Sequence, residues 1–339
     1  MSEPVPPLPG SARGKLPHVP AAFFGIVLGL AALANLWRVG HALWGLPGLI
    51  GETLFAGAAF AWVVVALLYA AKWWIAPDVA RQEAEHAVQC CFIGLGGVTT
   101  LLIAQGALPY SRAVAIALFT LGSAFTLAFG LWRTGRLWRG RRAPEATTPI
   151  LYLPTVAGGF VAGTTAAALG WSDWGQLAFG AAFFSWLAIE SVLLHRLYTA
   201  DEMPPLLRPT LGIQLAPPAV GAVCYLAVGG GAGDLLGHAL IGYALLQALL
   251  LLRMARWIGA APFAASYWAF TFGGVAFATA VAKIDLVAPT PAIALLAPIL
   301  FAGANLLVLA IAIGTLCLLL GGRLLPSTVP VGPPKTTGS

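Results

Sequence analysis

Ten long apolar stretches run through this chain of 339 residues and constrain its fold more than any other feature. A helix needs about 20 apolar residues to cross the ~30 Å hydrocarbon core of a bilayer. Because 59% of the residues are hydrophobic and only 9% are charged, the stretches predict an all-α integral membrane protein with ten transmembrane helices. The predicted spans are residues 20–37, 49–71, 87–108, 111–132, 150–170, 174–195, 210–229, 235–252, 263–282 and 292–320.

No polar linker divides the apolar region, which predicts a single transmembrane domain over residues 20–320. The Pro-rich residues 1–19 and the polar residues 321–339 are predicted to be disordered tails. The first apolar stretch lacks a small-residue cleavage site, so we expect it to be retained as a span and not removed as a signal peptide.

Helix-breaking residues fall in alternate stretches. The first, third, fifth, seventh and ninth contain, in order, Pro20, Gly97, Pro154, the pair Pro217 and Pro218, and the pair Gly273 and Gly274. Irregular backbone inside a bilayer is tolerated only where neighbouring protein or a water-filled cavity satisfies it. We therefore expect five helical hairpins, with an inner ring of the five odd-numbered helices lining a pore and an outer ring of the five even-numbered helices facing lipid.

The basic residues predict the orientation of the spans. Of the 18 Lys and Arg residues, 15 lie in the two tails or in alternate loops, and only Arg38, Lys283 and Arg112 lie on the opposite side. Because positively charged loops are retained inside the cell, both termini are predicted to be cytoplasmic. The arginine cluster at residues 133–142 is interpreted as a contact with anionic lipid headgroups of the bilayer. No soluble nucleic-acid-binding module accompanies it, so nucleic acid is not an expected partner.

The ninth stretch suggests a gate. Residues three, four and seven apart share a helix face, and the face through Phe272 carries otherwise small side chains: Ala265, Ala269, Ala276 and Thr279. A lone ring on such a face predicts a plug, although ordinary core packing is the alternative. Gly273 and Gly274 directly follow the ring and would allow the backbone to bend there.

The other odd stretches also show faces of small residues. Together with Phe272 as gate, the candidate pore-lining residues are Gly25, Gly29, Gly97, Thr100, Pro154, Gly158, Gln214, Pro217, Gly221, Ala269, Gly273 and Ala276. Small residues four apart, such as Gly25 and Gly29, equally describe tight helix packing in membranes. The two interpretations remain open at this point.

Charged residues are scarce near the centres of the odd stretches. Glu190 is expected to form a structural ion pair with His195 or Arg196. Lys283 and Asp285 are expected to form a snorkelling pair at the membrane interface, and the alternative is that they attract or screen permeant ions. Hydroxyls, glycines and the positive ends of broken helices favour anions over cations. The absence of HExxH, GxSxG and P-loop patterns argues against an enzyme, and no spacing of Cys or His suggests a metal or another cofactor.

Several motifs resemble one family. They are PAAFFGIVLG at 20–29, ATTPILYLPTVAGGF at 146–160, LGWSDWGQLAFGAAFFSWLAIE at 169–190, LRPTLGIQLAP at 207–217, GYALLQ at 242–247 and WAFTFG at 268–273. In order and separation they resemble the TehA-type tellurite-resistance and C4-dicarboxylate transporter family, which is related to fungal malate and sulfite transporters and to plant guard-cell slow anion channels.

The resemblance implies a homotrimer in the bacterial inner membrane, with five helical hairpins around a pore in each protomer. It also implies an aromatic gate on the ninth helix, at the position of Phe272. The expected substrates are small inorganic anions or C4-dicarboxylates. We therefore predict a passive anion channel or uniporter. The alternative is a gradient-coupled secondary transporter of C4-dicarboxylates, or an exporter of tellurite-like or toxic compounds.

Overall fold

The computed structural model describes residues 17–140, 146–229, 231, 233–260 and 262–324. Ten of its helical segments are long and apolar enough to cross a membrane, from 19 to 30 residues each. Within the described residues there is no strand, so the prediction of an all-α protein with ten spans is confirmed. The predicted tails fall mostly in residues 1–16 and 325–339, outside the described part, and the domain boundaries stay predictions.

Five odd-numbered spans combine short irregular helices with a regular one. They are η1 (Ala21–Phe23) with α1 (Phe24–Trp44); η2 (Gln89–Gly94) with α4 (Leu95–Ala107); η4 (Pro149–Tyr152) and η5 (Leu153–Ala157) with α6 (Gly158–Ala168); η6 (Pro205–Leu215) with α8 (Ala216–Ala227); and η7 (Ala265–Trp268) with α11 (Ala269–Val287).

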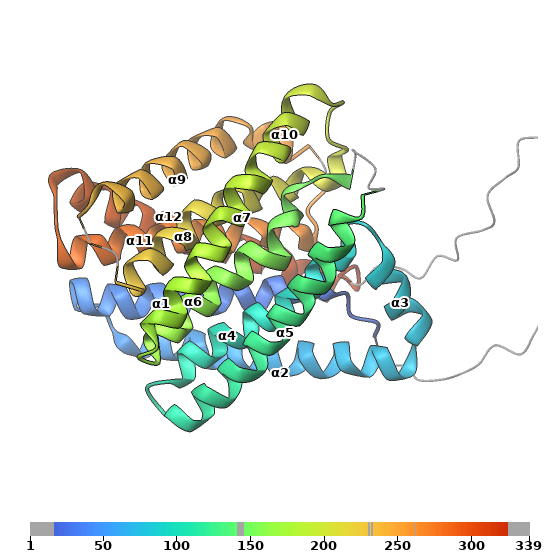
Figure 1. Cartoon of the computed structure of the whole chain (residues 1–339), viewed down its shortest axis with the longest axis horizontal. Coiled ribbons are helices and arrows are strands. Elements are labelled where there is room, and N and C mark those ends of the chain that lie inside the picture. Colours follow the sequence, from blue (N-terminus) through green and yellow to red (C-terminus); the bar gives the residue numbers. More distant parts are fainter. Residues whose placement is uncertain (1–16, 141–145, 230, 232, 261, 325–339) are drawn as a thin grey trace, which may run out of the picture.

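The five even-numbered spans are α-helical throughout. They are α2 (Gly48–Ile75), α5 (Arg112–Trp138), α7 (Ser172–Thr199), α9 (Leu235–Arg253) and α12 (Pro291–Leu320). Two short helices, α3 (Pro77–Glu85) and α10 (Ala255–Ile258), lie outside the spans. The long helices lie side by side, with α3 at one end of the bundle (Figure 1).

The two sets of spans differ in burial. In the most apolar part of each odd span, 61–78% of the residues are buried, against 22–28% in each even span. Each odd span packs against the even span that follows it, which gives the five expected hairpins. The odd spans also contact one another in the closed order α1, α4, α6, α8, α11 and back to α1. An even span therefore presents most of its apolar surface outward, as a lipid-facing helix does.

Irregular backbone is concentrated where the odd spans begin. Pro20 precedes η1, Pro154 lies in the π-helical η5, and Pro217 lies in the first turn of α8. Proline lacks the N–H that an interior helical position needs, so it favours these non-α segments and helix starts. The side on which the odd spans begin is called the start side below, and the opposite side the end side.

The helix breaks expected at the glycines are wrong. Gly97 lies inside α4, and Gly273 and Gly274 lie inside α11, which runs unbroken from Ala269 to Val287. Glycine retains its N–H, so it can continue a helix that proline would interrupt. Instead, these glycines allow neighbouring helices to pack closely. A Cβ on Gly273 of α11 would lie 2.9 Å from the backbone nitrogen of Ala216 at the start of α8.

Three even spans begin at side chains that cap the helix. Ser111 accepts a hydrogen bond from the N–H of Val114 before α5, and Asp234 accepts one from the N–H of Gly237 before α9. Thr290 caps α12 in the same way. Such caps satisfy backbone donors of the first turn, so the chain re-enters the bundle at defined positions on the end side.

We expect Gly97→Ala to destabilise the protein. An added Cβ would clash with the Thr126 hydroxyl and lie 3.0 Å from the carbonyl oxygen of Gly122, so α4 and α5 would have to separate. Overpacking of this kind costs about 1–3 kcal/mol. The matched control is Gly180→Ala in α7, where a Cβ meets nothing within 4 Å. Thermal unfolding of the purified protein should show a lower melting temperature for Gly97→Ala only; equal melting temperatures would contradict this packing role.

Candidate functional site

A first cavity lies among the starts of the odd spans. Its volume is about 50 Å³, and this start-side cavity draws wall residues from all five odd spans. They include Ala22 and Gly25 of the first span, Phe92 and Leu95 of the third, Tyr152 and Phe160 of the fifth, Pro217 and Val220 of the seventh, and Ala265, Ala269 and Phe272 of the ninth. The wall is almost entirely apolar or aromatic.

A second cavity lies farther along the same five spans. This end-side cavity has a volume of about 210 Å³. Its wall is formed by Ala32, Asn35, Arg38 and Val39 of α1, Leu102 and Gln105 of α4, Val161 and Thr164 of α6, Val220 and Val223 of α8, and Phe272, Ala276, Thr279 and Lys283 of α11. Polar and basic side chains are more frequent here than in the start-side cavity.

Phe272 lies between the two cavities. Its ring is 6% exposed, and Phe272 and Val220 are the residues that line both. Along η7 and α11, Ala265 and Ala269 line the start-side cavity, whereas Ala276 and Thr279 line the end-side cavity. The small-residue face identified in the sequence therefore coincides with the wall of both cavities, and Phe272 contributes to both walls.

The structure brings only some of the predicted pore-lining residues to these walls. Gly25, Pro217, Ala269 and Ala276 line a cavity, as Phe272 does. The others, which lie outside both walls, are Gly29, Gly97, Thr100, Pro154, Gly158, Gln214, Gly221 and Gly273.

Helix packing explains most of the residues outside the walls. A Cβ on Gly29 would lie 2.8 Å from the Trp268 ring, and one on Gly221 would lie 3.1 Å from the Phe160 ring. Thr100 accepts a hydrogen bond from the Trp62 indole at 3.1 Å and so faces α2. Small residues at these positions let neighbouring helices approach closely, which is the packing alternative that the sequence left open.

Pro154 and Gly158 line a different feature. Both contribute to an apolar groove of about 970 Å³ on the outer surface, formed by α5, η5, α6 and α7. Trp138 and Trp174 lie along the same groove. An apolar surface of this kind is expected on the lipid-facing side of a membrane protein.

The end-side cavity contains polar residues that sequence reasoning did not select. Arg38 and Asn35 lie on α1, Gln105 on α4 and Thr164 on α6. Lys283, expected to pair with Asp285, has no ion pair in the part of the chain that the structure describes. The helical spacing from Phe272 through Ala276 to Lys283 could have identified the lysine as part of the same face.

Glu190 corrects another expectation. It forms no ion pair with His195 or Arg196; instead its buried carboxylate accepts hydrogen bonds from four neutral donors. These are the indole of Trp186 at 2.9 Å, the amide of Gln214 at 2.7 Å, and the hydroxyls of Tyr243 at 2.5 Å and of Tyr152. The donors come from α7, η6, α9 and η4, so the cluster ties two even spans to the starts of two odd spans.

This cluster also accounts for Gln214. Its amide nitrogen donates both to Glu190 and, at 3.2 Å, to the Tyr152 hydroxyl. Tyr152 in turn lines the start-side cavity. Gln214 therefore acts one layer behind the cavity wall, where it holds a wall residue in place. Among the described residues, no group of three His, Cys, Asp or Glu side chains could hold a metal ion.

We expect Glu190→Leu to lower the melting temperature strongly. The substitution leaves the Trp186 indole and the Tyr152 hydroxyl buried without the carboxylate that accepts their hydrogen bonds, at about 1–3 kcal/mol for each unpaired group. Ser191→Ala is the matched control, because among the described residues the exposed Ser191 hydroxyl bonds only the carbonyl of Leu187 in its own helix. Thermal unfolding in detergent compares the two; a Glu190→Leu protein as stable as the control would show that the cluster has no structural role.

Comparison with known proteins agrees with this architecture. The voltage-dependent anion channel family matches residues 18–316. The tellurite resistance protein TehA homolog of Haemophilus influenzae is 35% identical over 256 residues, which cover 75% of this chain and 78% of that protein.

Two plant proteins are more distant relatives. The guard cell S-type anion channel SLAC1 of Arabidopsis thaliana is 24% identical over 271 residues, which cover 75% of this chain and 47% of that protein. The S-type anion channel SLAH4 of the same plant is 26% identical over 219 residues, covering 62% and 59%. The matched region contains nearly all of the ten spans, and the resemblance drawn from the motifs is confirmed. This protein is therefore a multi-pass membrane protein of the voltage-dependent anion channel (SLAC1) family.

Proposed function

We propose that the protein is an anion channel or uniporter, with a pore along the five odd spans of each protomer and Phe272 as its gate. One observation carries the proposal: the Phe272 ring lies between two cavities whose walls are both formed by all five odd spans. The ring closes the path between them. An apolar constriction of this kind blocks ions because they cannot keep their hydration shell while passing it.

The charges of the cavity walls support anions as the permeant species. The charged side chains that line the end-side cavity are Arg38 and Lys283, both basic. A cavity lined by one sign of charge concentrates ions of the opposite sign. Membership of an anion channel family, with relatives named as anion channels, supports a transport role instead of an enzymatic one.

Orientation and assembly belong to the same proposal. The bias of 15 to 3 in Lys and Arg supports an orientation with the start side and both termini in the cytoplasm. The start-side cavity then faces the cell interior and the end-side cavity the exterior. We propose a homotrimer in which each protomer conducts independently, carrying small inorganic anions such as chloride or nitrate. The tellurite resistance named for the Haemophilus relative is a second candidate role.

Phe272→Ala should increase anion conductance. Removing the ring joins the two cavities, and an increase on the order of tenfold corresponds to a barrier lowered by about 1.4 kcal/mol. Currents are measured in planar bilayers or oocytes, with the amount of protein in the membrane quantified. Phe270→Ala is the matched control, since Phe270 lies two residues away on α11 and lines neither cavity. Unchanged current in Phe272→Ala would reject the gate.

Ion substitution on Phe272→Ala separates passive passage from coupled transport. A passive anion pathway gives reversal potentials that follow the gradient of the permeant anion when chloride is replaced by nitrate. They should stay constant when only the pH gradient changes. A reversal potential that follows the proton gradient would favour the coupled transporter of dicarboxylates or toxic oxyanions over the channel.

A further inference from the structure

The end-side cavity contains a lysine that the rest of the protein does not neutralise. Lys283 lies 11 residues after Phe272 on α11, about 16 Å along the helix at 1.5 Å per residue and on the same face. Lys283 lines the cavity, and within the described residues its side chain makes neither a hydrogen bond nor an ion pair. A cation removed from bulk water is stable only when an anion or several polar groups compensate its charge.

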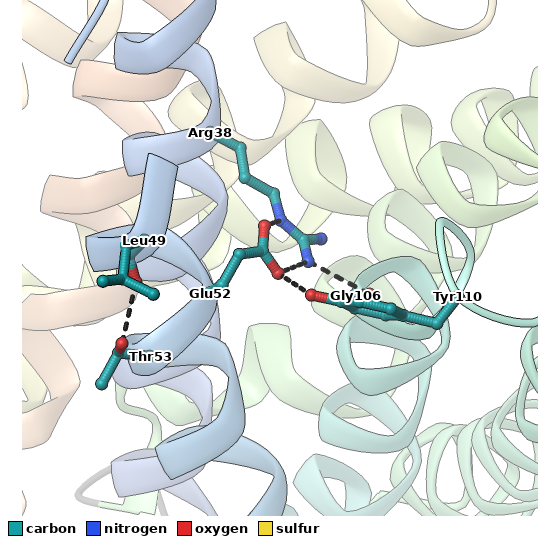
Figure 2. A network of polar contacts seen from close by, with 6 residues as sticks. All are labelled: Arg38, Leu49, Glu52, Thr53, Gly106 and Tyr110. Carbon is teal, nitrogen blue, oxygen red and sulfur yellow. Dashed lines mark hydrogen bonds and ion pairs between the residues drawn. The ribbon is translucent and has the colours of Figure 1, made fainter. Parts of the chain in front are cut away.

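The other cation of this cavity is neutralised. Arg38 donates from Nε and Nη2 to the Glu52 carboxylate at 2.8 and 2.7 Å, and from Nη2 to the Gly106 carbonyl at 3.2 Å. The Tyr110 hydroxyl donates to the same carboxylate (Figure 2). This hydrogen bond to Glu52 raises the pKa of Tyr110, so the hydroxyl keeps its proton and remains a donor. Glu52 thus offsets the charge of Arg38.

The remaining wall suits a small hydrated anion. The cavity volume of about 210 Å³ has room for an ion and several waters, each of which occupies ~30 Å³. Asn35 and Gln105 line the same cavity as Lys283. Gln105 is held in place by a 2.8 Å hydrogen bond from its amide nitrogen to the Thr165 hydroxyl. Amide N–H groups are suitable donors to an anion, and they add no charge.

Building on the channel function proposed above, we propose that the end-side cavity is an anion-binding site centred on Lys283. The Arg38–Glu52 pair keeps the net charge of the site near that of one lysine. The site is therefore suited to a monovalent anion such as nitrate or chloride, and it is less suited to a divalent anion, whose second charge would find no partner.

Nitrate binding to the purified protein tests the site without a measurement of ion currents. Nitrate replaces gluconate at constant ionic strength, and the melting temperature is followed. A ligand that binds the folded state raises it with concentration. We expect nitrate to raise the melting temperature of the wild-type protein and of Lys283→Arg. In Lys283→Gln the nitrate concentration needed for the same rise should increase on the order of tenfold, since a partly desolvated charge is lost.

Asp285→Asn is the matched control, because Asp285 lies two residues away and does not line the cavity. It should keep the nitrate response of wild type. A wild-type melting temperature that does not respond to nitrate overturns the site. So does a Lys283→Gln protein that responds as wild type does, or an Asp285→Asn protein whose response changes as much as that of Lys283→Gln.

A second variant tests the role of Glu52. Glu52→Gln removes the charge that offsets Arg38, so the site gains positive charge and should bind sulfate more tightly relative to nitrate. Thr53→Ala is the control, because in the described part of the chain the Thr53 hydroxyl bonds only the Leu49 carbonyl of its own helix, at 2.8 Å (Figure 2). An unchanged preference for nitrate over sulfate in Glu52→Gln overturns the assigned role of the pair.

The binding site and the channel can fail separately. If Phe272→Ala carries no anion current while nitrate still stabilises the protein through Lys283, the channel is rejected and the site stands. If Phe272→Ala conducts and Lys283→Gln changes neither the nitrate response nor the half-saturating nitrate concentration of the current, the site is rejected and the channel stands.

Discussion

In a bilayer, water is not available to satisfy irregular backbone, so a helix can depart from α geometry only where other protein surrounds it. The fold depends on this constraint. The five odd spans all begin with 3₁₀ or π segments, and they are the five whose residues are mostly buried by the rest of the protein. Residues without bulky side chains bring these spans together. Gly97 packs against α5, Gly29 against α11 and Gly273 against α8. Many of the small residues therefore set the distance between helices, and a smaller number face the cavities.

Polar groups at membrane depth follow a related rule. Glu190 is buried with four neutral donors around it, and its position is defined by Trp186, Gln214 and two tyrosines. Arg38 is held by Glu52 and by a backbone carbonyl. Each of these groups is costly to bury unless its hydrogen bonds are satisfied. Lys283 differs from them because it faces the end-side cavity without a protein partner among the described residues. This difference is the reason to connect it with a permeant ion.

Much of the fold could be predicted from the sequence. Ten spans follow from the length and apolar character of the stretches, because these are local properties that the bilayer thickness converts directly into helices. The face of α11 through Ala269, Phe272 and Ala276 follows from helical periodicity alone. The glycines were predicted less well. Gly25 and Gly29 look alike in the sequence, yet of the two only Gly25 lines a cavity. Which of them faces the cavity depends on how α1 is rotated about its axis relative to α11.

By itself, the sequence determined the class of protein, the number of spans, the family and the position of the candidate gate. These depend on composition, on periodicity and on motifs that are contiguous in the chain. Only the tertiary structure decided which residues meet across spans. The Glu190 cluster contains a direct hydrogen bond between residues 62 positions apart, and the Arg38–Glu52–Tyr110 network joins α1, α2 and the turn that follows α4. Such contacts depend on the rotation and depth of each helix, which packing with its neighbours decides and which local sequence does not encode.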